Sequence, residues 1–238
     1  MRAAACVQLP LVIVLAGPPA ALSAQVCTAL PSFQQRPLQV SVSGVYAGSD
    51  TKGASIAVGA GTGQWFAGAG VGASNHPWYL GPRSTHDLKA NVGIELPAVG
   101  GRISLCPITR FAYTSSVCCY GNDGHTEAID LGISAGGAFR RNRGVSPTGS
   151  VGFGLAYSRG TMDVGPAPNL ITNVILGLVT LNLGFVDGDY AVRSGVSIPF
   201  EPAMSTLDFA RDVLITNPSI TLDFALNFGP ARRTRSEH

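Results

Sequence analysis

The sequence predicts an all-β fold, an antiparallel transmembrane β-barrel of about ten strands, with about eight or twelve strands as alternatives. Three observations predict this fold. Apolar residues recur at every second position in ten segments of the chain. The links between these segments are alternately short and long, and aromatic residues gather at both ends of the apolar face.

The composition agrees with a membrane-exposed fold and excludes several other classes. Charged residues make up 13% of the chain, against roughly 25% in a typical soluble domain. Hydrophobic residues make up 45%, which argues against intrinsic disorder. The formal net charge is only +2, and the lysines are Lys52 and Lys89 alone. No nucleic-acid partner is therefore expected.

The chain begins with the pattern of a secretory signal peptide. Arg2 precedes a short apolar run at residues 12–15, and small residues end the segment at Ala24. Gly17-Pro18-Pro19 interrupts the run, leaving it shorter than the roughly 20 apolar residues of a spanning helix. The predicted parts are a signal peptide (1–24), an N-terminal periplasmic segment (25–37), the barrel (38–229) and a basic C-terminal tail (230–238).

The first five predicted strands place apolar side chains on one face and mostly small or polar side chains on the other. Their alternating apolar positions include, in order, Leu38, Val40 and Val42; Ala54, Ile56 and Val58; Trp65, Ala67 and Val71; Leu88, Val92 and Ile94; and Ile103, Leu105 and Phe111. A period of two residues belongs to a strand, because successive side chains point to opposite faces. The opposite face includes Gln39, Ser41 and several glycines.

The last five predicted strands repeat this alternation. Their apolar positions include, in order, Ile129, Leu131 and Ile133; Val151, Phe153 and Leu155; Ile175, Leu181 and Leu183; Val192, Val196 and Ile198; and Ile220, Leu222 and Leu226. In a soluble β-sandwich the face opposite the core would be rich in Lys, Glu, Asp and Thr, whereas here it is mostly Gly, Ala and Ser. Lipid on one side and a narrow lumen on the other explain this composition better.

The predicted links differ in length at the two ends of the strands. Short turns fall at residues 62–64, 97–101, 140–144 and 187–189, which define a turn rim. Long loops fall at residues 75–87, 115–125, 159–169 and 201–218, which define a loop rim, and the short link at 49–52 is the exception there. Within the last loop, Ser205-Thr206-Leu207-Asp208 predicts either a short helix over residues 209–214 or a strand extension.

Aromatic side chains on the apolar face fall at the two rims. The predicted girdles comprise Tyr46, Tyr113, Tyr157 and Phe200 at the loop rim, and Trp65, Phe139, Phe185, Tyr190 and Phe228 at the turn rim. Aromatic rings favour the interface between a membrane and water. The pattern therefore predicts where the barrel enters and leaves the lipid.

With these features the chain resembles the family of small bacterial outer-membrane β-barrel proteins, over about residues 38–228. The last segment, which ends at Phe228, is similar to the aromatic-ended closing strand recognised by barrel-assembly machinery, although residues 229–238 follow it. The resemblance implies a location in the outer membrane of a Gram-negative-type envelope, with outer-membrane lipid and that machinery as partners. It implies no cofactor.

The face opposite the apolar one carries a few charges that should point into the lumen. This predicted luminal network comprises Lys89, Glu95, Arg102, Arg110, Asp130, Arg193 and Asp223. Burying an unpaired charge is costly, so these groups should form ion pairs or a hydrated network. The network either lines a selective polar passage or ligand site, or only balances its own charge.

Cysteines and histidines leave further alternatives open. Four cysteines follow the signal segment, and export permits disulfides. We expect a Cys27–Cys106 disulfide, because residue 106 faces inward near the turn rim. Cys118 and Cys119 form a vicinal disulfide or stay free. A metal site formed by these two cysteines and His125 would lack any recognised ligand spacing, so we expect no metal.

The sequence thus predicts a non-enzymatic outer-membrane barrel with a structural, narrow porin-like channel or ligand-binding role. One alternative is an outer-membrane hydrolase whose catalytic groups lie in its loops. Against this alternative, we expect no catalytic motif and no histidine within a strand. The other alternative is a secreted soluble β-protein with an interaction role. The loop residues available to a hydrolase are His76, His86, His125, Asp163, Asp208 and Asp212.

Overall fold

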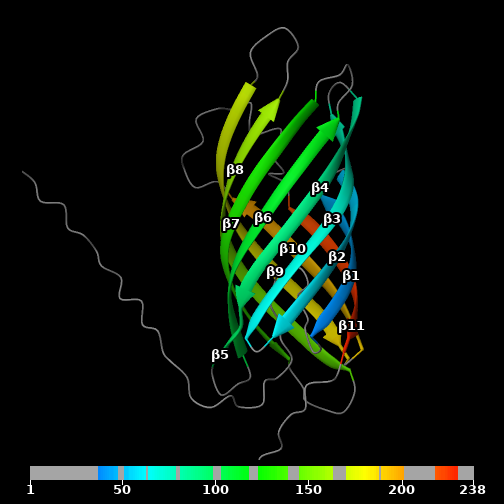
Figure 1. The fold of residues 1–238 in the computed structure, drawn as a ribbon, viewed down its shortest axis with the longest axis vertical. Helices are drawn as coiled ribbons and strands as arrows, with labels where there is room; N and C mark the ends of the chain where they lie inside the picture. The colour runs from blue at the N-terminus through cyan, green and yellow to red at the C-terminus, as the bar shows by residue number, and fades with distance from the viewer. Residues whose placement is uncertain are drawn as a thin grey trace, which may run out of the picture.

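The computed structural model describes ten stretches of the chain, and nearly every residue in them is part of a strand. The described residues are 37–47, 51–62, 64–78, 81–98, 103–117, 123–138, 145–162, 170–187, 189–200 and 218–229. Figure 1 shows the strands as one tilted, curved wall that closes on itself. Among the described residues, no helix is long and apolar enough to cross a membrane.

Eleven strands are joined in a single antiparallel sheet. They are β1 (Leu38–Ala47), β2 (Thr51–Thr62), β3 (Trp65–Trp78), β4 (Gly81–Ile94), β5 (Leu96–Ala98), β6 (Ile103–Val117), β7 (Asp123–Ala138), β8 (Ser146–Met162), β9 (Leu170–Val186), β10 (Tyr190–Phe200) and β11 (Ser219–Phe228). β1 pairs with β11, and β4 pairs with β6, so the sheet has no free edge.

β4 and β5 together occupy one strand position in the barrel. Both pair with β6 in one continuous register, and only Glu95 separates them. Pro107 continues that register opposite Ile94 and has no amide hydrogen to donate, which weakens the ladder at this point. The fold is therefore a closed barrel of ten strands, which confirms the predicted fold class.

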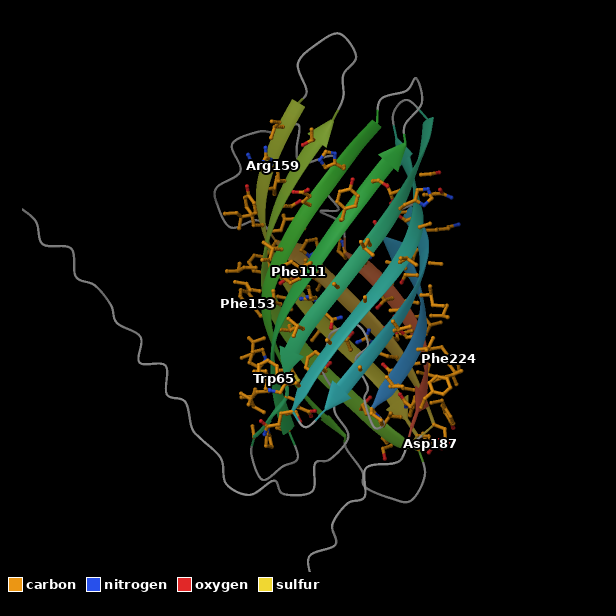
Figure 2. The ribbon with its side chains drawn as sticks, in the orientation of Figure 1. Trp65, Phe111, Phe153, Arg159, Asp187 and Phe224 are labelled. Atoms are coloured by element: carbon orange, nitrogen blue, oxygen red, sulfur yellow. The ribbon has the colours of Figure 1, made fainter. Side chains whose placement is uncertain are left out.

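The alternation predicted from the sequence sorts the side chains between the outside and the inside of this barrel. Large apolar side chains such as Leu131, Leu183 and Leu222 lie exposed on the outer face. Labelled Trp65, Phe111, Phe153 and Phe224 are among the side chains drawn along the wall in Figure 2. A face this apolar is stable next to lipid, where the closed sheet pairs the backbone amides and carbonyls of neighbouring strands.

The strands extend farther toward the loop rim than predicted. Residues 75–78 continue β3 and residues 81–87 begin β4, so His76 and His86 are strand residues and not loop residues. His125 likewise lies in β7. The prediction that no histidine lies in a strand is wrong, because backbone pairing continues here after the outward side chains have become polar.

The corrected boundaries leave part of the barrel outside the apolar band. β8 and β9 each have 17 residues, whereas roughly 9–11 residues suffice to cross a bilayer. On β8 the outward face changes from Phe153 and Tyr157 to Arg159, which lies near the upper end in Figure 2. The ends of these long strands therefore project beyond the lipid-facing band at the loop rim.

Several predicted features fall outside the described residues. They are the signal peptide, residues 25–36 of the N-terminal segment, the basic tail, the segment 209–214, and residues 140–144 of the third turn.

Candidate functional site: the charged lumen

Among the ion pairs of the described residues, the most deeply buried one joins β10 to β11. Arg193 and Asp223 are direct register partners. Arg193 Nε donates a hydrogen bond of 2.6 Å to Asp223 Oδ2, and Nη2 pairs with the same oxygen. The two side chains are only 7% and 9% exposed. A pair that is this well shielded interacts strongly, but each partner depends on the other for compensation of its charge.

A second ion pair lies on the opposite wall, between β6 and β7. Arg110 and Asp130 are register partners, and Arg110 Nη2 lies 2.8 Å from Asp130 Oδ2. The neighbouring strand makes room for this pair with a glycine. A Cβ atom added at Gly154 would lie 2.7 Å from Asp130 Oδ1 and 3.3 Å from Arg110 Nη2. Gly154 therefore provides the space that the ion pair occupies.

Replacing Gly154 by Val should displace this ion pair. We expect a loss of about 1–3 kcal/mol in the free energy of unfolding, as for other overpacked sites. The cost should fall when Asp130→Ala is added, since the added side chain then has space. Denaturant unfolding of the two single variants and the double variant measures this coupling; strictly additive effects would contradict the assignment.

A third pair involves a residue that the sequence analysis placed in a loop. Asp87 faces inward on β4, where its Oδ1 accepts a hydrogen bond of 2.9 Å from the Thr114 hydroxyl. Lys89 Nζ lies 3.5 Å from Asp87 Oδ2. The alternation Asp87, Lys89, Asn91 continues the inward face of the strand and could have revealed Asp87, had the strand been extended through residue 87.

The remaining members of the predicted network lie near the turn rim or outside the described residues. Glu95 is fully buried, and its backbone amide donates to the carbonyl of Gln64 at 2.7 Å. Arg102 is outside the described residues. In the same part of the barrel, Gln39 Nε2 donates a buried hydrogen bond of 2.7 Å to Asn227 Oδ1. Uncharged polar pairs thus contribute to the lumen alongside the ion pairs.

The exposure of the inward side chains changes along the barrel. Near the turn rim they are buried, and those at most 5% exposed include Gln39, Ser41, Phe66, Glu95, Ser104, Cys106, Ile108, Ser134, Thr148, Val186, Ala191, Ala225 and Asn227. Toward the loop rim, inward residues such as Ser55, Ser74, Thr126 and Ser197 are partly exposed, although Ala47, Thr85, Ser158, Val174 and Leu176 remain buried.

The three ion pairs follow the same gradient. The side chains of Arg193 and Asp223 are under 10% exposed, those of Arg110 and Asp130 are 26% and 15% exposed, and those of Lys89 and Asp87 are 42% and 15% exposed. The interior is therefore packed toward the turn rim and accessible to solvent toward the loop rim.

On the outer face, the described aromatic residues of the two predicted girdles are all exposed. They are Tyr46, Trp65, Tyr113, Tyr157, Phe185, Tyr190, Phe200 and Phe228, while Phe139 lies outside the described residues. Trp65 and Tyr190 begin their strands at the turn rim, and Phe200 ends β10 at the loop rim. The phenol of Tyr157 donates to Asn173 Oδ1 at 2.9 Å, as suits an aromatic ring at the edge of an apolar band.

The residues proposed for a hydrolase do not assemble into a catalytic centre within the described chain. His125 lies on the outer face and stacks on Tyr113, with ring centroids 5.9 Å apart. Asp163, Asp208, Asp212, Cys118 and Cys119 are outside the described residues. No group of three His, Cys, Asp or Glu side chains that could hold a metal occurs among the residues that the structure describes.

One motif escaped the sequence analysis. Residues 132–136 spell G-x-S-x-G, the pattern of a nucleophile elbow. An elbow needs a sharp turn from a strand into a helix, with an exposed serine at its tip. Ser134 instead lies within β7, faces inward and is 2% exposed. This environment gives it no access to a substrate.

The comparisons with known proteins concern the fold. The architecture is that of a closed antiparallel β-barrel. No family model and no curated protein matches the chain. Among solved structures, the translocator domain of the autotransporter NalP from Neisseria meningitidis is similar at 13% identity, covering 79% of this chain and 85% of that chain, with a TM-score of 0.46.

Two further solved barrels are similar to this chain. The β domain of the Bordetella autotransporter BrkA has 12% identity over 80% of this chain and 98% of that chain, with a TM-score of 0.49. The N-terminal β-barrel domain of Pseudomonas aeruginosa OprF has 12% identity over 82% of this chain and all of that chain (100%), with a TM-score of 0.37. At these values the likenesses say nothing about activity.

Proposed function

We propose that this chain is an exported, non-enzymatic outer-membrane barrel whose lumen is open toward the cell exterior and closed toward the periplasm. The observation that carries this proposal is the exposure gradient of the luminal ion pairs, from Lys89 at 42% to Arg193 at 7%. Short turns face the periplasm and longer loops face outward in bacterial barrels. The closed end is therefore the periplasmic one.

This gradient favours a structural or ligand-binding role over a channel. A hydrated passage needs polar groups accessible to water along its whole length. Here the inward side chains near the turn rim include the apolar Phe66, which packs in a cluster with Cys106 and Ile108. An added Cβ at Gly93 would clash with the Phe66 ring, so this ring packs over the inner face of the neighbouring strand β4.

A membrane location is supported by the outer face. The exposed apolar residues form a band bounded by aromatic side chains, and a closed antiparallel sheet can span hydrocarbon without unpaired backbone groups. The predicted signal peptide would supply export, and the Cys27–Cys106 disulfide would form in an oxidising envelope. Cys106 is fully buried in the lumen, while Cys27 lies outside the described residues.

Planar-bilayer recording of the purified, folded full chain tests the proposal. We expect no steady conductance from the wild type, because buried side chains close the turn-rim end. Combining Phe66→Ala with Ile108→Ala should produce measurable openings, whereas the outward pair Phe111→Ala with Ile129→Ala should not. A stable, ion-selective conductance from the wild type would refute the closed lumen.

A further inference from the structure

Cys106 lies on the inner face of β6, near the turn rim. It is fully buried and disulfide-bonded. Its register partner on β7 is Ser134, which is 2% exposed, and the register of β4 and β5 places the fully buried Glu95 on its other side. The sheet has no free edge, so a second cysteine can reach this sulfur only through an open end of the barrel.

Only one other cysteine of the exported chain can reach Cys106. The remaining cysteines all lie outside the described residues, and they are Cys6, Cys27, Cys118 and Cys119. β6 continues from residue 106 to Val117, a distance of about 36 Å at about 3.3 Å per residue. Cys118 and Cys119 lie within about 8 Å of that end, whereas the Cα atoms of a disulfide lie about 4.4–6.8 Å apart. Cys6 belongs to the predicted signal peptide, so Cys27 remains.

Pro37 fixes the other end of the segment that follows Cys27. Its carbonyl accepts a hydrogen bond of 2.9 Å from the amide of Gly61, and successive register partners lead from Gly61 across β3 and β4 to Ile108 on β6. Pro37 is therefore level with a residue only two positions from Cys106. With strands about 4.8 Å apart, the path along the wall is about 20 Å. The ten residues from 27 to 37 extend to about 33 Å, so the segment is long enough.

The inward residues at the turn rim include many that are small and yet buried. Side chains alone just fill a barrel of about eight strands, and this barrel has ten strand positions. The small inward residues that are at most 5% exposed include Ser41, Ser104, Cys106, Ser134, Ala191 and Ala225. They belong to five different strands. A chain segment that crosses the lumen would cover residues on several strands at once, and this matches the pattern of burial.

We propose that Cys27 is the partner of Cys106, and that residues 27–36 form a strap across the turn-rim end of the lumen. This inference rests on the proposed function, because the bond requires export into an oxidising envelope. The bond forms by thiol–disulfide exchange with an oxidised disulfide donor. The sulfurs of Cys27 and Cys106 become joined, and the donor leaves as a dithiol that has accepted two electrons and two protons. The strap then ties the start of β1 to the far wall.

Peptide mapping of the folded full chain by mass spectrometry, without reduction and with free thiols blocked by N-ethylmaleimide, tests the partner. Trypsin cleaves at Arg110, which separates Cys106 from Cys118 and Cys119. We expect the peptide that contains Cys27 to be linked to the peptide that contains Cys106 until a reductant separates them. Linkage of Cys106 to Cys118 or Cys119, or a Cys106 blocked by the reagent, would overturn the proposal.

Limited proteolysis of the folded full chain in micelles tests the strap. Phe33 is the only aromatic residue between Cys27 and Pro37, so chymotrypsin cleaves the segment there. A segment tied at both ends must open before a protease can bind it, and we expect Cys27→Ser to be cut at least about tenfold faster than the wild type. Cleavage is followed by mass spectrometry after reduction.

The matched control is the double variant Cys118→Ser with Cys119→Ser, which should be cut at Phe33 as slowly as the wild type. Equal rates in the wild type and in Cys27→Ser would overturn the strap. Equally fast cleavage in Cys27→Ser and in the control would do so as well, because the effect would then not depend on the bond to Cys106. Heat-modifiable gel mobility verifies that each variant is folded.

The closed lumen and the strap can fail separately. A wild type that conducts steadily refutes the closed lumen, whatever the partner of Cys106. A wild type that does not conduct, but in which Cys106 pairs elsewhere or Phe33 is cut equally fast with and without Cys27, refutes the strap alone.

Discussion

Replacing Asp223 by Ala is expected to lower the free energy of unfolding by about 3–5 kcal/mol, because it removes the carboxylate that pairs with a buried cation. Arg193 is 6% exposed and makes both its Nε hydrogen bond and its Nη2 ion pair with one oxygen of Asp223. Once that oxygen is gone, the guanidinium stays in a packed region where water cannot replace it. Denaturant unfolding in micelles, followed by tryptophan fluorescence, measures the loss.

Two controls separate loss of the partner from loss of packing. The double variant Arg193→Met with Asp223→Leu removes both charges and should recover most of the stability, since apolar pairs of similar volume often replace buried ion pairs at little cost. Asp87→Ala disrupts the more exposed pair with Lys89 and should cost much less. A double variant as unstable as Asp223→Ala would show that charge compensation is not the cause.

Replacing Gly184 by Val is the second change with a large expected effect. Gly184 faces inward on β9, opposite Arg193 of β10. An added Cβ would lie 2.4 Å from the Val192 carbonyl oxygen and 3.1 Å from Arg193 Cα. Both contacts are with backbone, so the strands would have to move apart. We expect a loss of about 1–3 kcal/mol or more in the free energy of unfolding, because the site becomes overpacked. β9 and β10 should also pair less closely beside the Arg193–Asp223 pair.

Gly44 supplies the matched control for this substitution. It also lies within a strand, on β1, but nothing comes within 4 Å of an added Cβ. Gly44→Val should therefore be nearly neutral in the same unfolding measurement, or slightly stabilising, because Val favours a strand more than Gly does. Equal destabilisation by Gly184→Val and Gly44→Val would mean that glycine at 184 is not required for close strand approach.

The histidines show where sequence reasoning failed. His86 and His125 were expected in loops because the apolar alternation stops before them. Strand pairing depends on the backbone, however, and continues through Asp87–Thr114 and Ser115–His125 after the outward residues have become polar. A periodicity in hydrophobicity detects the part of a strand that faces lipid and misses the part that projects beyond it.

The G-x-S-x-G motif is the opposite case, because the sequence pattern is present but the turn that it usually indicates is not formed at this position. Its residue types match a catalytic pattern, but Ser134 lies in a continuous strand between its partners Cys106 and Gly152. A motif acquires chemical meaning only through the local geometry that carries it. Here the glycines that frame the serine belong to the inner wall of a barrel and not to a turn.

The all-β class, the ten strands and the face of each strand that meets lipid follow from the sequence alone. Local alternation is sufficient for this, because a side chain's face follows from its position along its own strand. Which charges meet was decided by the tertiary structure. Arg193 and Asp223 are 30 residues apart, and only the register between β10 and β11 makes them partners.

The tertiary structure also decided that the lumen closes at one end. Phe66 is buried because it packs against Gly93 on β4 and against Cys106 and Ile108 on β6, whereas Lys89 stays 42% exposed. Both are inward positions on neighbouring strands, so alternation assigns them the same environment. The burial of an inward side chain depends on the neighbouring strands of the closed barrel, and the sequence of one strand does not predict it.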